Sequence, residues 1–489
     1  MNNFLNELDK KTNIAFTANE AKSYATSGSN LLDFFSKSGS LRHDLESGLG
    51  YFIRALAEDE VMALRALFYA RDVRGGQGER DLPRIIMRFL AKTNSELIAR
   101  NMHLIPEFGR WDDLYIFTGT KLEEQAYKIM HEQFSKDMTS DSPSLLGKWL
   151  KSENTSSKDS RELARITLRH FKMTPKEYRK ALVSLRNKIN ILEQKISNNK
   201  WDNIDYSSVP SQAARIYRNA FLKHDAERYV EFLNKVEKGE ETINADTLYP
   251  YQITHNLLSN YNINENEIKS LDVLWNNLPN YLEEGERAIS VVDTSGSMHV
   301  CISNKTNVQA IDVALSLGIY FAERNTGVFK DRFLTFSRNP KLQKIIGKNI
   351  YEKLNNLFRA DWDANTDLMK VFLAILGAAK QANSPKTDLP NKIFIISDMQ
   401  FDVAVRGNDL TNFEAIDKLY KEAGYKRPEL VFWNVRGYDD SPVTKDETGA
   451  YLVSGFSPSI LKYALKGEER TALDLMNEVL NSERYSIIK

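Results

Sequence analysis

The hydrophobic periodicity of this chain changes near residues 283–286, and this change constrains the fold more than any other feature. From Leu41 to about Glu284, apolar residues recur at the spacing of amphipathic helices. After that point, short apolar runs alternate with helical segments, which is typical of a parallel sheet covered by helices. We therefore predict an α + α/β protein, with a helical part at residues 41–284 and a doubly wound, Rossmann-type domain at residues 285–489.

The first part is predicted to be a series of helices. Helical spacing is clearest at residues 51–69, 83–99, 111–134, 160–171, 175–197, 211–222 and 226–236. Near Thr174, the sequence Thr-Pro-Lys-Glu combines an N-cap, a first-turn Pro and a capping-box Glu. Consecutive helices with short breaks predict a HEAT-like α-solenoid, although the sequence shows no fixed repeat period. Residues 1–40 are polar and weakly periodic, so we expect a loosely packed N-terminal arm there.

The second part is predicted to alternate strands and helices. Strands are expected at residues 288–292, 331–336, 392–397, 429–435 and 450–454. Helices are expected at residues 308–325, 341–357, 367–381, 413–423, 457–465 and 470–481. The first strand ends at Asp293, and a polar loop follows it. Open α/β sheets bind ligands at the carboxyl ends of their strands, so this loop is a candidate site.

The loop after the first strand has the chemistry of a hard-cation site. Asp293 supplies a carboxylate, while Ser295 and Ser297 supply hydroxyls two residues apart. Thr366 opens a later helix, and Asp398 ends the strand at residues 392–397. Mg²⁺ takes oxygen ligands and usually only one or two carboxylates, so these five residues suit Mg²⁺ or Mn²⁺.

Asp-x-Ser-x-Ser after a buried strand, followed by a Thr and an Asp in that order, resembles the metal-ion-dependent adhesion site of von Willebrand factor A (vWA) domains. The resemblance implies a vWA-like fold with a metal at Asp293, Ser295, Ser297, Thr366 and Asp398. It also implies that an acidic residue of a protein partner completes the coordination. The usual Gly-Gly before the Thr is Ala364-Asn365 here. The alternative is a vWA-like sheet with an empty site. Ser295 disfavours an aspartic protease, which needs Gly there, and a haloacid-dehalogenase-type phosphatase, which needs a second acid.

Composition limits the classes of partner. Lys+Arg and Asp+Glu both number 66, so any nucleic-acid binding must come from local patches. The single cysteine, Cys301, excludes an internal disulfide and a multi-Cys zinc site. The N-terminus has no signal-peptide pattern, and no apolar run reaches membrane-spanning length. We expect a cytoplasmic protein without membrane contact.

One segment is strongly basic. Residues 161–200 hold eleven Lys or Arg and three Glu, a formal charge of +8. Arg161, Arg165 and Arg169 recur every four residues, which places them on one helix face. Such a face is expected to contact an RNA backbone. The candidate residues are Arg161, Arg165, Arg169, Lys172, Lys176, Arg179 and Lys180. The alternative is a solvated face that is balanced by acids on neighbouring helices.

Two other segments of the helical part stand out. The glycine-rich stretch Arg71–Arg80 is interpreted as a tight connector, in preference to an arginine-flanked phosphate nest. Under the nest interpretation, Arg71, Arg74 and Arg80 join the candidate RNA contacts. Further along, Trp111 is a candidate core anchor, and Asp112 and Asp113 are interpreted as partners of a helix dipole.

The order of motifs in the helical part resembles an uncharacterised domain-of-unknown-function family with a helical half and a vWA-like half. The motifs are Arg-Gly-Gly-x-Gly-Glu-Arg, Gly-Arg-Trp-x-Asp-Leu, Lys-Trp-Leu-x-Ser-Glu-Asn, Tyr-Arg-Lys and Val-Pro-Ser. The layout is also similar to the Ro autoantigen, or TROVE, family, in which a HEAT-like ring binds noncoding RNA and is closed by a vWA domain. The resemblance implies that the helical part binds RNA and that the vWA-like part carries the metal site. It does not imply which residues of the helical part contact RNA.

These features favour a non-enzymatic RNA-binding or ribonucleoprotein scaffold protein with a Mg²⁺-dependent docking site. The alternative is a protein-interaction adaptor that captures an acidic partner residue through the metal, without RNA. A hydrolase ranks third, because the sequence shows no Ser-His-Asp or zinc-type spacing and its seven His residues are scattered. The sequence predicts no oligomeric state.

Overall fold

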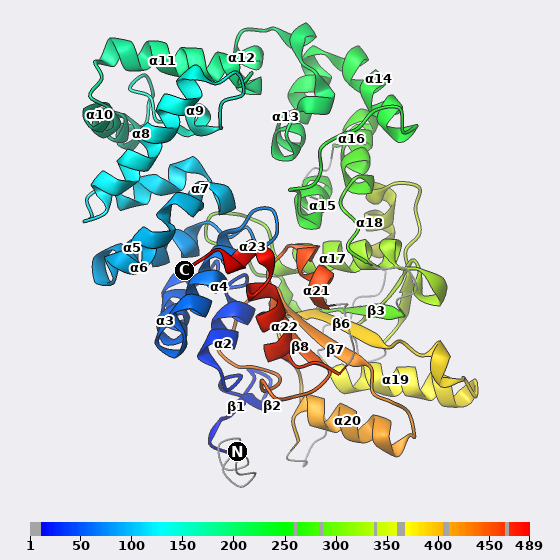
Figure 1. The fold of residues 1–489 in the computed structure, drawn as a ribbon. Helices are drawn as coiled ribbons and strands as arrows, with labels where there is room; N and C mark the ends of the chain where they lie inside the picture. Colours follow the sequence, from blue (N-terminus) through cyan, green and yellow to red (C-terminus); the bar gives the residue numbers. More distant parts are fainter. Residues whose placement is uncertain are drawn as a thin grey trace.

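The computed structural model describes residues 11–258, 262–282, 287–336, 340–358, 367–403, 410–464 and 469–489. After a short N-terminal segment, the helices of the first part follow one another along an arc (Figure 1). They are α3 (Leu45–Glu58), α4 (Glu60–Arg71), α5 (Asp81–Thr93), α6 (Ser95–Asn101), α7 (Ile105–Phe108), α8 (Glu123–Thr139), α9 (Leu146–Trp149), α10 (Lys158–Phe171), α11 (Pro175–Lys188), α12 (Leu192–Ser197), α13 (Ser211–His224), α14 (Ala226–Glu237), α15 (Pro250–Leu258) and α16 (Glu265–Asn276). Short 3₁₀ turns lie between them at Met102–Leu104, Trp111–Phe117, Trp201–Asn203 and Tyr206–Ser208.

Several segments that the periodicity predicted as one helix are two. The expected helix at residues 51–69 is broken at Asp59, whose backbone is extended and whose carboxylate accepts from the amide of Met62. Asp59 therefore ends α3 and caps α4, since a carboxylate at this position satisfies a free amide of the first turn. The capping box predicted at Thr174 and Glu177 is confirmed at the start of α11.

The described part of the N-terminal segment, residues 11–40, packs on the rest of the protein, in contrast to the loose arm that the sequence predicted for residues 1–40. It contains strands β1 (Ile14–Phe16) and β2 (Lys22–Tyr24), which pair antiparallel, and helix α2 (Asn30–Lys37). Seven of the eight residues of α2 are buried, and the helix packs against α3, α4 and β8. The apolar group Leu31, Leu32, Phe34 and Phe35 explains this packing.

The second part contains a six-stranded sheet in the order β5-β4-β3-β6-β7-β8. Its strands are β3 (Ala288–Val292), β4 (Arg332–Thr335), β5 (Leu342–Lys344), β6 (Lys392–Ser397), β7 (Glu429–Asn434) and β8 (Ala450–Ser454). All neighbours pair in parallel except β5, which pairs antiparallel with β4. This is a doubly wound order, with its topological switch point between β3 and β6. The α + α/β class predicted from the sequence is confirmed.

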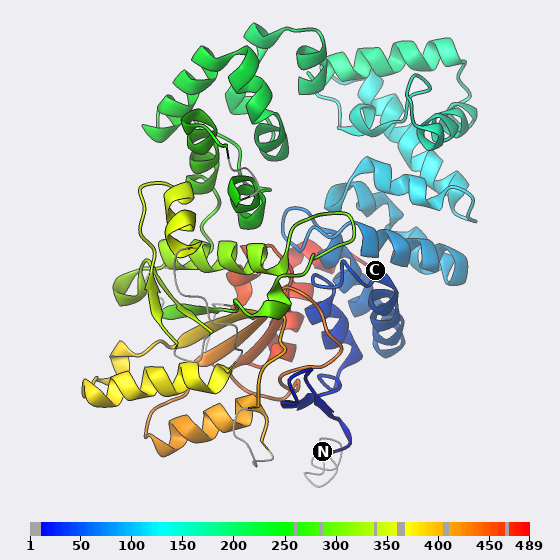
Figure 2. The same ribbon diagram turned by 180° about the vertical axis from the view of Figure 1, so that it is seen from behind.

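Helices cover both sides of the sheet. They are α17 (Ala310–Arg324), α18 (Ile350–Phe358), α19 (Leu368–Gln381), α20 (Asn412–Glu422), α21 (Leu461–Ala464), α22 (Ala472–Leu480) and α23 (Glu483–Ser486), with 3₁₀ turns at Gly296–Met298, Gly327–Phe329, Lys386–Asp388 and Pro458–Ile460. In both views, α17 lies on one side of the sheet, and α19 and α20 lie on the other (Figures 1 and 2). The predicted helix at residues 341–357 is partly wrong, because β5 occupies its first residues.

Both ends of the helical arc pack on the α/β part. At one end, α2 contacts β8, and α4 contacts α22 and α23. At the other end, α15 contacts α17, and α16 contacts α18. The arc therefore starts and finishes on the same α/β unit (Figure 2). Among the described residues, we find no helix that is both long and apolar enough to cross a bilayer.

Candidate metal centre and basic surfaces

The two predicted carboxylate ligands lie at the ends of adjacent strands. Asp293 follows β3, and Asp398 follows β6, which pairs with β3 in parallel through Val292 and Ile396. The amide of Asp293 donates to the carbonyl of Ile396 at 2.9 Å. Both carboxylates are fully buried. They therefore sit on the two strands that flank the switch point, where doubly wound sheets bind ligands.

The hydroxyls of the loop gather around Asp293. One carboxylate oxygen of Asp293 accepts from the amide of Ser295 at 2.9 Å, and the other accepts from the hydroxyl of Ser397 at 2.5 Å. The hydroxyls of Ser295 and Ser297 are 3.0 Å apart. Sequence reasoning missed Ser397. Its position directly before Asp398, at the end of a buried strand, was the available signal.

Burial dominates the electrostatics of this cluster. Burial, followed by repulsion from Asp398, raises the pKa of Asp293 to about 6, against the opposing hydrogen bonds of Ser397 and Ser295. Burial also raises the pKa of Asp398, opposed by the hydroxyl of Ser297, the amide of Gln400 and the charge of Arg436. The Oδ2 atom of Asp398 is buried and has no hydrogen-bond partner among the described residues.

This donor set fits a hard divalent cation. Two buried carboxylates and two adjacent hydroxyls supply only oxygen ligands, and the unpartnered oxygen of Asp398 needs a positive partner. The fifth predicted ligand, Thr366, lies outside the described residues. Within the part of the chain that the structure describes, no group of three or more His, Cys, Asp or Glu is arranged to hold a metal.

The basic segment forms an exposed face on α10 and α11. Six of the seven predicted residues are exposed: Arg165, Arg169, Lys172, Lys176, Arg179 and Lys180. Arg165 lies 3.8 Å from Glu153, whereas none of the other five takes part in an ion pair among the described residues. Arg161 differs, because its guanidinium donates to the carbonyls of Thr155 and Ser156 ahead of its own helix.

The glycine-rich stretch between α4 and α5 is a tight connector. The amides of Gln77, Gly78 and Glu79 donate to carbonyls of α4 and its C-cap, so they do not form a phosphate nest. Arg71 is buried and bonds to Asp113 through Nε at 2.9 Å. Arg74 is exposed and donates to a main-chain carbonyl.

The two acids after Trp111 have a different role from the predicted one. Asp113 accepts from the amide of Arg110 in a capping box, but its carboxylate also binds the guanidinium groups of Arg71 and Arg84. Asp112 lies in the same buried cluster and pairs with Arg84 at 3.1 Å. Arginine side chains, more than a helix dipole, therefore compensate these acids.

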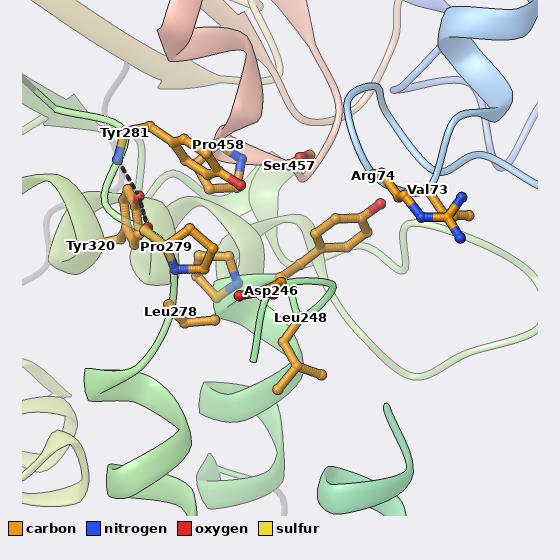
Figure 3. Close-up of a pocket in the computed structure, with 12 residues that line it drawn as sticks. Val73, Arg74, Asp246, Leu248, Leu278, Pro279, Tyr281, Tyr320, Ser457 and Pro458 are labelled. Atoms are coloured by element: carbon orange, nitrogen blue, oxygen red, sulfur yellow. Dashed lines mark hydrogen bonds between the residues drawn. The ribbon is translucent and has the colours of Figure 1, made fainter. Parts of the chain in front are cut away.

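A small cavity lies where five separate segments of the chain meet (Figure 3). Its volume is about 10 Å³, which is the space of a single water. Beside it, the amide of Tyr281 donates to the hydroxyl of Tyr320, which in turn donates to the carbonyl of Pro279 (Figure 3). The cavity holds no more than a water, and the residues around it are packed and hydrogen-bonded. We therefore interpret this region as a structural contact between the helical and α/β parts.

Comparison with known proteins identifies relatives without a known function. Residues 144–285 match a family model described as Domain of unknown function (DUF2828), and residues 287–485 match one described as Domain of unknown function (DUF7788). The chain is also similar to the uncharacterized protein L728 of Acanthamoeba polyphaga mimivirus. The two are 29% identical over 512 residues, covering 96% of this chain and 87% of the relative. These matches support a relationship to uncharacterised families, which the motif order of the sequence indicates.

Proposed function

We propose that this protein is a non-enzymatic RNA-binding scaffold with a Mg²⁺-dependent, vWA-like docking site. The observation that carries the proposal is the buried carboxylate pair of Asp293 and Asp398 at the switch point of the sheet. The pair is surrounded by hydroxyls, and one of its oxygens lacks a partner among the described residues. A cation held by two carboxylates and neutral hydroxyls retains an affinity for one more anionic oxygen.

The RNA half of the proposal depends on the exposed face of α10 and α11. Five cations there are free of ion pairs among the described residues, which supports the RNA-binding interpretation. Glu153 beside Arg165 and Glu123 near Arg169 support the alternative of a balanced, solvated face. Arg161 and Arg71 are committed to contacts within the protein, and we leave both out of the proposed surface. The HEAT-like solenoid of the TROVE layout would present such a face to RNA.

A thermal-shift measurement tests the metal site. Mg²⁺ or Mn²⁺ binds only the folded state, so it should raise the Tm of the wild type by mass action. The variant Asp398→Asn should show no such rise, because it removes one of the two carboxylates. Ser303→Ala, in the loop that follows the candidate metal-site serines but outside the donor set, is the control and should respond like the wild type. An equal rise in Asp398→Asn would refute the assignment.

An RNA-binding titration tests the basic face. Replacing Arg165, Arg169 and Lys172 with Gln should weaken binding to RNA of unrelated sequences. The slope of log K against log salt should shrink by roughly 0.7–0.9 for each lost phosphate contact. Arg88→Gln on α5 removes an exposed cation elsewhere and should leave both quantities unchanged. If the triple variant keeps its affinity and slope, RNA binding does not occur on this face.

The second candidate function is a protein-interaction adaptor, and the buried carboxylate pair favours it equally. In vWA domains the metal captures an acidic side chain of a partner. Ser295→Ala with Ser297→Ala should then abolish Mg²⁺-dependent capture of a protein partner and leave RNA binding intact. A wild type that captures a partner in Mg²⁺, loses it in EDTA and binds no RNA would favour the adaptor.

A further inference from the structure

An open cavity of about 700 Å³ lies between the helical arc and the α/β part. Residues from α5, α13 and α15 line it, together with the loop at residues 302–308 that follows the metal-site serines. Lys305 of this loop pairs with Asp81 at the start of α5, which closes one side. Arg80, Arg110 and Trp149 also line the cavity and form the wall considered below.

The positive charge at this wall exceeds the negative charge. Asp112 and Asp113 are the carboxylates of the buried cluster, and four guanidinium groups surround them. The contacts are those of Arg71 and Arg84 with Asp113, at 2.7 and 2.5 Å, and those of Arg84, Arg110 and Arg80 with Asp112, at 3.1, 3.2 and 3.7 Å. Lys151 lies beside this cluster, and none of the ion pairs among the described residues includes it.

Arg110 has a guanidinium nitrogen that the acids of this cluster leave without a partner. Its Nη2 atom is buried without a hydrogen-bond partner among the described residues, and its guanidinium is fixed by stacking on Trp149 at 4.3 Å. Burial and the neighbouring Arg80 and Arg71 lower the pKa of Arg110, despite Asp112. Burial and the neighbouring Arg84, Arg110 and Arg80 likewise lower the pKa of Lys151, despite Asp112. A surplus of positive charge in a partly buried cluster is costly, and a bound anion would reduce that cost.

We propose that Arg80 and Arg110 form a binding site for a phosphate group at the wall of this cavity. Guanidinium forks match the oxygens of a tetrahedral dianion, and a surplus of positive charge favours a dianion over a single carboxylate. The cavity is larger than a phosphate ion and has the volume of a small-molecule pocket. Trp149, Tyr217 and Tyr251 also line it, which suits a flat ring. The ligand class is therefore a nucleotide-sized phosphate ester, either a free mononucleotide or the phosphorylated end of a nucleic acid.

This site is separate from both elements of the proposed function. It uses no residue of the metal loop and none of the exposed face of α10 and α11. Its test can fail while the proposed function holds, and the reverse is also true. Binding measurements in EDTA exclude any contribution from a metal.

Calorimetric titration with AMP in EDTA tests the site. The wild type should bind AMP, and Arg80→Gln should weaken the binding by about tenfold or more, the effect of losing a charge-assisted hydrogen bond. Arg80 is about half exposed, and its contact with Asp112 is long, so this variant should fold normally. Arg88→Gln, in the same helix but outside the cavity, is the matched control and should bind like the wild type. Arg110→Gln should weaken binding at least as much as Arg80→Gln.

Two further probes separate the sources of the phosphate. Inorganic phosphate that competes with AMP would assign the affinity to the phosphate group itself. A 5′-phosphorylated oligonucleotide that binds, and loses affinity when dephosphorylated or when Arg80 is replaced, would assign the site to a nucleic-acid end. AMP binding should be unchanged when Arg165 and Arg169 are replaced with Gln. If no probe binds, or if Arg80→Gln and Arg88→Gln bind alike, the site does not exist.

Discussion

Gly78 shows how a single residue holds two distant segments of the arc together. Its φ of +66° lies in the left-handed region, and a Cβ atom there would overlap the hydroxyl of Tyr249. That hydroxyl donates to the carbonyl of Gln77 at 3.0 Å. The connector between α4 and α5 therefore packs directly on a residue that precedes α15, at the opposite end of the arc.

Gly78→Ala should therefore destabilise the protein more than a Gly→Ala substitution at a positive-φ position without a close neighbour. Strain from a positive φ costs about 1–2 kcal/mol for a residue with a Cβ. The displaced Tyr249 adds the loss of a hydrogen bond, a further ~1 kcal/mol. Gly119→Ala is the control, because Gly119 has a φ of +78° with nothing within 4 Å of the added Cβ. Chemical denaturation should show a larger loss for Gly78→Ala, and equal losses would contradict this account.

At the scale of single residues, the sequence predicts where a side chain lies in the fold better than which residue it contacts. Asp293 and Asp398 follow apolar runs directly, so the strand pattern alone places them at one edge of the sheet. The pairing of Ser397 with Asp293 depends on the register between β3 and β6, which no local pattern contains. Likewise, Arg71 belongs to a basic motif, but its partner Asp113 lies 42 positions away. Contacts between residues distant in the sequence therefore decide whether a cationic side chain is exposed or held in an internal ion pair.

At the scale of elements, His255 of α15 connects the helical arc to the start of α17. Its Nδ1 lies 3.0 Å from a carboxylate oxygen of Asp312, and its Nε2 lies 3.2 Å from the side-chain oxygen of Asn307. Two oxygen acceptors favour the doubly protonated ring. The hydrogen bond to Asp312 raises the pKa of His255, against burial and the nearby Arg215.

This contact predicts a pH dependence of stability. Because the folded-state pKa of His255 is raised, its stabilising effect is complete below the unfolded value of about 6.5 and is lost as the pH rises through the folded-state pKa. The Tm of the wild type should fall relative to that of His255→Gln as the pH rises above about 6.5. Parallel Tm curves for the two proteins across that range would show that this contact does not titrate.

Element boundaries were predicted where capping chemistry is local and missed where it is not. The starts of α11 and α17 and the strands at 288–292, 392–397 and 450–454 match the sequence patterns closely. The edge strand β5 was missed because three residues of a strand leave too short an alternating pattern. Asp59 interrupts a continuous helical periodicity, and only its capping geometry reveals the break.

At the scale of the whole molecule, the change of periodicity near residues 283–286 was sufficient to predict the α + α/β class. It could not predict that the arc returns to the α/β part at both ends, because these contacts join elements that are distant in the sequence, in the case of α2 and β8 by hundreds of positions. The amide of Gly39, for example, donates to the hydroxyl of Ser454, 415 positions away. The packing of the N-terminal segment was missed for the same reason.

The contact between α2 and β8 has a consequence for the synthesis of this protein. Helix α2 is translated before β8 and α22, which contact it in the folded protein. Until β8 and α22 are translated, the part of α2 that packs on them is uncovered, and closing so long a loop slows folding. We therefore expect the nascent chain to carry an exposed apolar helix face through most of translation and to need a chaperone there. Chains that terminate before β8 should aggregate or be degraded.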